Sequence, residues 1–178
     1  GYAEINSANS TTPPYDTVYP IVIENEIVNV CYTASSFLGS DETYLTDFFA
    51  AVEDIYTYYC IENGFKEPYG PKNSGDANFS TLKVYITDQV IASENGRTYI
   101  LPEGSSCIWI KESHAKTSLV SQTLAHEFMH AINYAHLSYG SSGWFNESIP
   151  TMASMIYQYD RNNYVFNDIQ KFNDYGAF

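Results

Sequence analysis

The residues that could carry chemistry are His126, Glu127 and His130, which form an HExxH motif. Because four residues make about one helical turn, both imidazoles would lie on one side of a helix and could bind one metal ion. Glu127 would lie beside them, where its carboxylate could take a proton from a metal-bound water. The spacing therefore predicts a helix that supplies two metal ligands and a general base.

A catalytic zinc ion normally takes three protein ligands and leaves one position for water, so a third ligand is needed. The first candidate is Glu147, in the segment Trp144-Phe145-Asn146-Glu147. Sixteen residues lie between His130 and Glu147, enough for the motif helix to end, a loop to turn back and another helix to begin. A carboxylate in the first turn of that helix would face the two histidines.

The second candidate is His136, because the chain also reads HExxHxxNxxH. This pattern resembles the HExxHxxGxxH motif of metzincins, in which glycine lets the chain leave the helix in a left-handed conformation. Asn133 is the next best residue for that conformation, and Met155-Ile156-Tyr157 could stand for the methionine turn. However, apolar residues continue the helical pattern beyond Asn133, and a continued helix would carry His136 past the metal. Glu147 is favoured, and His136 remains the alternative.

Composition excludes several classes of protein. The chain has 178 residues, of which 44% are hydrophobic and 16% charged, so it is not a disordered chain. A formal net charge of −13 argues against nucleic acid or an anionic membrane as a partner. The sequence lacks both a signal-peptide pattern and an apolar run long enough to span a membrane. Cys31, Cys60 and Cys107 are compatible with one disulfide and a free thiol, or with three thiols.

The elements that must position the motif can be read from periodicity. Residues 1–20 are rich in Ser, Thr, Asn and Pro and predict an extended leader. Apolar residues at helical spacing predict helices from Ser40 or Asp41 to Gly64, from about 117 to 136 around the motif, and from 146 or 147 to about 159, with Pro150 in the first turn. One or two strands are expected in 21–33, and single strands at 81–87, 97–101 and 107–110.

These segments together resemble the gluzincins, the thermolysin- and aminopeptidase-like class, and in particular secreted bacterial hyicolysin-like peptidases. The specific segments are HExxH and Trp-x-Asn-Glu, within a likeness that covers about residues 21–160; Ser148 and Pro150 depart from the usual pattern. The resemblance implies an α+β, zincin-like fold, with a small mixed sheet packed on the motif helix and a mainly helical lower part. It also implies one catalytic domain over 21–178, shortened at its C-terminal end, and secretion or display at the cell surface.

The expected function is a zinc-dependent endopeptidase acting on protein or peptide substrates. Zinc would be bound by His126, His130 and Glu147, and Glu127 would move the proton of the attacking water to the leaving amine. Candidates for stabilising the transition state are His136, Tyr139 and Tyr157. An extended substrate would pair with an edge strand, either 97–101 or 107–110. The alternatives are a metzincin-type site and a binding or adhesion domain that keeps a peptidase fold without turnover.

Overall fold

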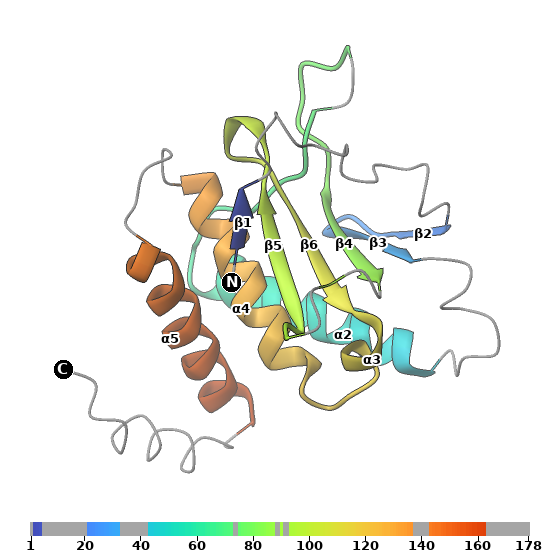
Figure 1. The fold of residues 1–178 in the computed structure, drawn as a ribbon, viewed down its shortest axis with the longest axis vertical. Helices are drawn as coiled ribbons and strands as arrows, with labels where there is room; N and C mark the ends of the chain where they lie inside the picture. The colour runs from blue at the N-terminus through green and yellow to red at the C-terminus, as the bar shows by residue number, and fades with distance from the viewer. Residues whose placement is uncertain are drawn as a thin grey trace.

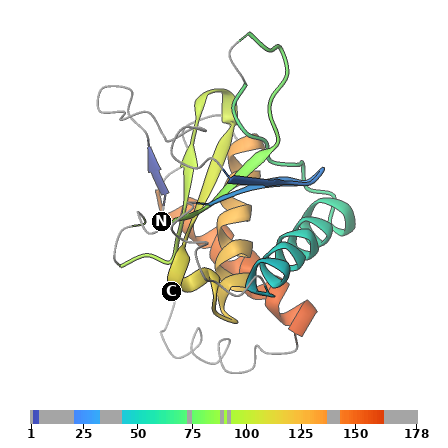
Figure 2. The same cartoon turned by 90° about the vertical axis from the view of Figure 1, so that its right-hand side faces the viewer.

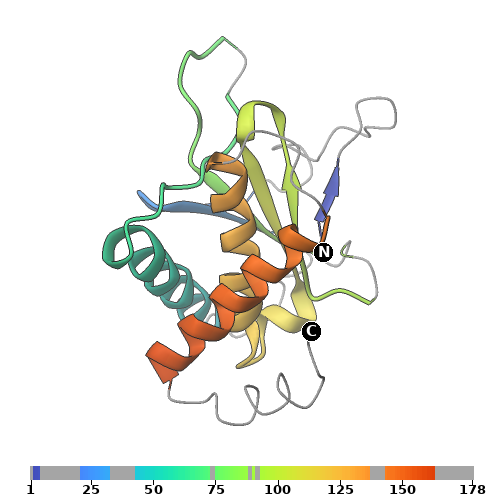
Figure 3. The same ribbon diagram turned by 90° about the vertical axis from the view of Figure 1, so that its left-hand side faces the viewer.

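The computed structural model describes residues 2–4, 21–32, 43–72, 75–87, 90, 93–136 and 143–162. In this part of the chain, one mixed β-sheet carries the helices α2, α4 and α5 on a single face (Figures 1 and 2). Helix α4 (Val120–His136) packs on the sheet, and α5 (Gly143–Asn162) packs on α4 (Figure 3). The prediction of an α+β architecture is confirmed, and the motif helix lies between the sheet and α5.

The sheet has six strands in the order β1-β5-β6-β4-β3-β2. β2 and β3 form an antiparallel hairpin, β3, β4 and β6 run parallel, β5 is antiparallel to β6, and β1 is parallel to β5. The strand bounds are Tyr2–Glu4, Ile21–Glu24, Val28–Tyr32, Leu82–Thr87, Gly96–Ile100 and Ser106–Lys111 for β1 to β6. Each predicted strand is present, and the segment 21–33 contains two.

Two predictions about the sheet are corrected by its order. Residues 107–110 belong to β6, which lies between β4 and β5, so the prediction that they form an edge strand is wrong. Residues 97–101 correspond to β5, which pairs with β6 on one side and with β1 on the other, so the prediction that they form an edge strand is also wrong. Part of the predicted leader thus forms a strand along β5; residues 5–20 lie outside the described chain.

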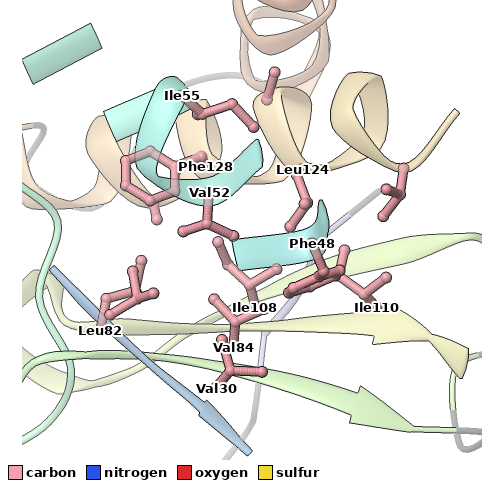
Figure 4. Packing of buried hydrophobic residues seen from close by; sticks show 14 of the residues in the cluster. Val30, Phe48, Val52, Ile55, Leu82, Val84, Ile108, Ile110, Leu124 and Phe128 are labelled. Atoms are coloured by element: carbon pink, nitrogen blue, oxygen red, sulfur yellow. The ribbon is translucent and has the colours of Figure 1, made fainter. Parts of the chain in front are cut away.

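Alternation along the strands places an apolar layer against the helices. Every second residue of β3, β4 and β6 faces α2 and α4, because side chains of a strand point alternately to its two faces. Each fully buried aliphatic side chain contributes about 1.5–3 kcal/mol, so this layer fixes how α4 lies on the sheet. Figure 4 shows the contact, made by Val30, Leu82, Val84, Ile108, Ile110, Phe48, Val52, Ile55, Leu124 and Phe128.

The first predicted helix is α2 (Thr43–Tyr56), which continues as the π-helical segment η1 (Thr57–Glu62). Gly64 follows the C-cap residue Asn63 and has φ +70°, the left-handed conformation that glycine adopts readily. The predicted stop at Gly64 is therefore confirmed. The predicted caps Ser40 and Asp41 lie outside the described residues.

The remaining helices differ from expectation at their starts. A short helix α3 (Glu112–Ala115) precedes α4, and a 3₁₀ turn η2 (Pro102–Gly104) joins β5 to β6. Because α5 begins at Gly143, Pro150 lies inside the helix, and the prediction that it falls in the first turn is wrong. No described helix is long and apolar enough to cross a membrane. All three cysteines are free thiols, with Cys60 half-buried.

Candidate metal centre

Helix α4 presents both histidines of the motif at one point. Its apolar residues recur every three or four positions and are buried against the sheet and α2, which fixes the rotation of the helix. His126 and His130, one turn apart, then lie side by side, with their Nε2 atoms 3.1 Å apart. The His130 side chain is 1% exposed and that of His126 is 20% exposed. The pair is therefore open to solvent mainly at His126.

Helix α5 brings Glu147 to the same point. Glu147 Oε2 lies 3.5 Å from Nε2 of His126 and 3.8 Å from Nε2 of His130. Ligand atoms of these three residues all lie within 4.8 Å of one another. The carboxylate side chain is 42% exposed, so the group is reached from the side of α5. The three residues that the sequence proposes as ligands are thus brought together by the packing of α5 on α4.

The protonation state of the pair suits metal binding. Burial lowers the pKa of His130 to about 3, with His126 as the next cause. Burial also lowers the pKa of His126, which the nearby Glu147 partly offsets. Both imidazoles are therefore neutral at neutral pH, and a metal ligand must be deprotonated in this way.

The donor set fits a small divalent cation. Two imidazole nitrogens and a carboxylate oxygen repel one another unless a proton or a cation lies between them. Nitrogens bound to zinc at about 2.0–2.1 Å in tetrahedral geometry are about 3.3 Å apart, close to the observed separations of 3.1 Å, 3.5 Å and 3.8 Å. The residues present can therefore hold a metal of this size, with two nitrogen ligands and one oxygen ligand.

Glu127 lies next to this group and is buried, with 2% of its surface exposed. The hydroxyl of Thr98, in β5, lies 2.8 Å from Glu127 Oε2 and 2.9 Å from the Glu127 carbonyl oxygen. Burial raises the pKa of Glu127 to about 7, an effect that the hydrogen bond from Thr98 opposes. A carboxyl group with such a pKa can both accept and release a proton near neutral pH.

His136 lies at the exposed end of α4, where its Nε2 accepts a hydrogen bond of 2.8 Å from the backbone N–H of Lys66. The helix runs without interruption through Asn133 to His136, about 9 Å of helix axis beyond His130. Among the described non-glycine residues only Glu103 has a positive φ, so Asn133 does not make the left-handed turn of the metzincin alternative. His136 is not brought to the two histidines.

Tyr157, another predicted stabiliser, makes its described contacts with α2 and η1. Tyr157 is buried, and its hydroxyl donates to Oδ2 of Asp54 in α2 over 2.8 Å. Its ring packs edge-on against Tyr58 of η1. Tyr139 lies outside the described residues.

Sequence reasoning missed Thr98, which contacts the proposed general base. Its position in a predicted strand gave one signal, since a threonine at a buried strand position needs a hydrogen-bond partner. The partner itself could not be found from the sequence, because Thr98 and Glu127 are 29 residues apart. No family model and no curated protein matches this chain.

Proposed function

We propose that this protein is a zinc-dependent endopeptidase of the gluzincin type. The observation that carries the proposal is the convergence of His126, His130 and Glu147 on one point, with the buried carboxyl group of Glu127 beside them. The first two residues and Glu127 come from one helical turn of α4, and the third ligand comes from α5. This is the division of roles that the sequence motif predicts.

Each residue has a defined task in the proposed reaction. When bound, zinc would polarise the substrate carbonyl and lower the pKa of a water molecule. Glu127 would accept the proton of the attacking water and deliver it to the leaving amine, a task for which a pKa near 7 is suited. His126 and His130 would stay neutral while holding the metal, because burial lowers their pKa values.

The proposed substrate is an extended peptide bound along β5. This strand carries Thr98, which contacts Glu127, so a peptide paired with the side of β5 opposite β6 would lie close to the general base. In the structure, β1 forms main-chain hydrogen bonds with this side of β5 in parallel, with Tyr2 opposite Thr98. A substrate would take this side of β5 in place of β1. The acidic, tyrosine-rich chain is proposed to work outside the cell.

The test is hydrolysis of fluorescently labelled casein and of quenched fluorescent peptides by the purified chain. We expect activity that a chelator abolishes and added zinc restores. Glu127→Gln should retain the same zinc content by elemental analysis and show no hydrolysis. The matched control is Glu26→Gln, an exposed residue in the turn between β2 and β3, which should behave as wild type.

Two results would overturn the proposal. One is a Glu127→Gln variant that cleaves peptides as fast as wild type. The other is a chain that takes up no zinc in equilibrium dialysis at neutral pH. A chain that binds zinc through His126, His130 and Glu147 without any hydrolysis would instead be a binding domain on a peptidase fold.

A further inference from the structure

Thr98 contacts two parts of Glu127 at once. Its hydroxyl lies 2.8 Å from the side-chain Oε2 and 2.9 Å from the main-chain carbonyl oxygen. Thr98 itself is 0% exposed, so water does not compete for these contacts. A single side chain of the sheet thus links the backbone of α4 to the carboxyl group that projects from it.

Thr98 is held firmly in its own position. It lies within β5, opposite Ile108 of β6 on one side and Tyr2 of β1 on the other. A threonine in a strand has restricted rotation about χ1, because two heavy atoms branch from its Cβ. Its hydroxyl is therefore a fixed point, whereas the Glu127 side chain has several rotatable bonds.

The close approach of α4 to β5 depends on Gly96, two residues before Thr98 on the same face of the strand. A Cβ atom at position 96 would lie 3.1 Å from Cγ of Glu127 and 2.8 Å from Cγ2 of Thr123. Both distances are shorter than ordinary van der Waals contact. The absence of a side chain at Gly96 therefore lets the helix come near enough for Thr98 to reach Glu127.

We propose that Thr98 is a positioning residue for Glu127, an inference that rests on the proposed peptidase function. The hydrogen bond to Oε2 fixes the carboxyl group in one rotamer and leaves Oε1 as the oxygen that meets the attacking water. A general base works only within hydrogen-bond reach of the proton it takes. Misplacement of a reacting group by about 1 Å can cost about 100-fold in rate.

The experiment compares Thr98→Val, which keeps the shape and removes the hydroxyl, with Thr98→Ser, which keeps the hydroxyl and removes the methyl group. In the zinc-loaded protein, Thr98→Val should lower kcat between about 10- and 100-fold, with KM and zinc content unchanged. Thr98→Ser should keep kcat within about threefold of wild type, although loss of a buried methyl group lowers its melting temperature. Hydroxyl and packing effects are thereby separated.

A second measurement does not depend on activity. Crystal structures of the metal-free variants should show the Glu127 side chain in one position in wild type and Thr98→Ser, and in several positions in Thr98→Val. Thr98→Ala, which also lacks the hydroxyl but cannot crowd its neighbours, should match Thr98→Val and serves in its place if that variant does not fold.

The inference is overturned if Thr98→Val keeps the wild-type kcat and an ordered Glu127, or if Thr98→Val and Thr98→Ser lose kcat equally. Its failure is distinct from failure of the proposed function. If zinc-loaded wild type hydrolyses nothing, the peptidase proposal fails, while the position of Glu127 in the crystals still decides what Thr98 does.

Discussion

Lys66 contacts His136 and caps the C-terminal end of α4. Its backbone N–H donates to His136 Nε2 over 2.8 Å, and its Nζ donates to the carbonyl oxygen of Ala135 over 3.3 Å. Cationic groups are favourable at this end of a helix, where carbonyl groups lack intrahelical partners. His136, which the sequence alone permits as a metal ligand, thus has a structural role at the end of the helix.

This contact leads to a prediction about metal affinity. Replacing His130 or Glu147 by alanine should weaken zinc binding by more than about 100-fold, the upper range for loss of a residue that only supports a ligand. His136→Ala should leave the zinc dissociation constant unchanged, because His136 is bound to Lys66 instead. Competition with a chromophoric chelator measures all three. Weakening by His136→Ala equal to that of Glu147→Ala would favour the metzincin-type site.

Glu127 should cost the metal-free protein stability at alkaline pH. Its pKa is raised from 4.5 to about 7, so its contribution to the stability of the wild-type apoprotein becomes progressively unfavourable as pH rises from about 4.5 to about 7, where the unfolded chain releases this proton first. Glu127→Gln has no such proton. Above pH 8 it should therefore be more stable than wild type by about 3 kcal/mol.

Urea unfolding of the metal-free proteins at several pH values measures this difference. Below pH 4.5 the two proteins should be equally stable, because Glu127 is then protonated whether the chain is folded or unfolded. The difference between the two proteins isolates Glu127, since His126 and His130 are present in both. A stability difference that is constant with pH would contradict the assignment of the raised pKa to Glu127.

Gly96→Ala should separate α4 from β5. The new Cβ would meet Thr123 Cγ2 at 2.8 Å and Ile110 Cδ1 at 3.0 Å, and such overpacking costs about 1–3 kcal/mol. The free energy of unfolding should fall by this amount, together with kcat. Adding Thr123→Ser, which removes the closest atom and keeps the hydroxyl that contacts His114, should restore part of both. A double variant no better than Gly96→Ala would argue against this contact.

Tyr157 should matter for stability and not for turnover. Its hydroxyl donates a hydrogen bond to Asp54 over 2.8 Å, and loss of a hydrogen bond to a carboxylate costs about 1.5–3 kcal/mol. Tyr157→Phe should lose this stability in thermal unfolding and keep kcat within about twofold. Tyr159→Phe is the matched control, because Tyr159 is 49% exposed. A large fall in kcat for Tyr157→Phe would restore Tyr157 as a candidate transition-state stabiliser.

The helices and strands could be predicted because the sequence patterns that indicate them are local. Apolar spacing located α2 and α4, alternation located β4, and the glycine at position 64 marked a helix end. The strand order was not predictable, since nothing within residues 107–110 shows that two other strands flank them. The start of α5 was misjudged because it begins at Gly143, three residues before Asn146, and glycine is a poor helix former.

In the candidate site, too, local relationships could be predicted from the sequence and contacts between distant segments could not. His126, Glu127 and His130 share one helical turn, so their mutual placement follows from helix geometry alone. Placing Glu147 at the site required an inference across a loop. The role of His136 could not be decided from the sequence, because its position depends on whether α4 continues through Asn133. Thr98 and Gly96 act on Glu127 through the packing of a strand on a helix. Contacts of that kind join distant parts of the chain and leave no local pattern.

The position of Glu147 near the start of α5 has a mechanical consequence. The far end of this helix is tied to α2 and η1, because Arg161 pairs with Asp54 at 3.1 Å and with Glu62 at 2.7 Å. A metal bound at Glu147 would tie the near end to α4, so that α5 is clamped at both ends. Removing the metal should then release one end only. On metal removal, backbone amide hydrogen exchange should become faster in the first turns of α5 and remain slow around Tyr157, because only the start of the helix loses its attachment.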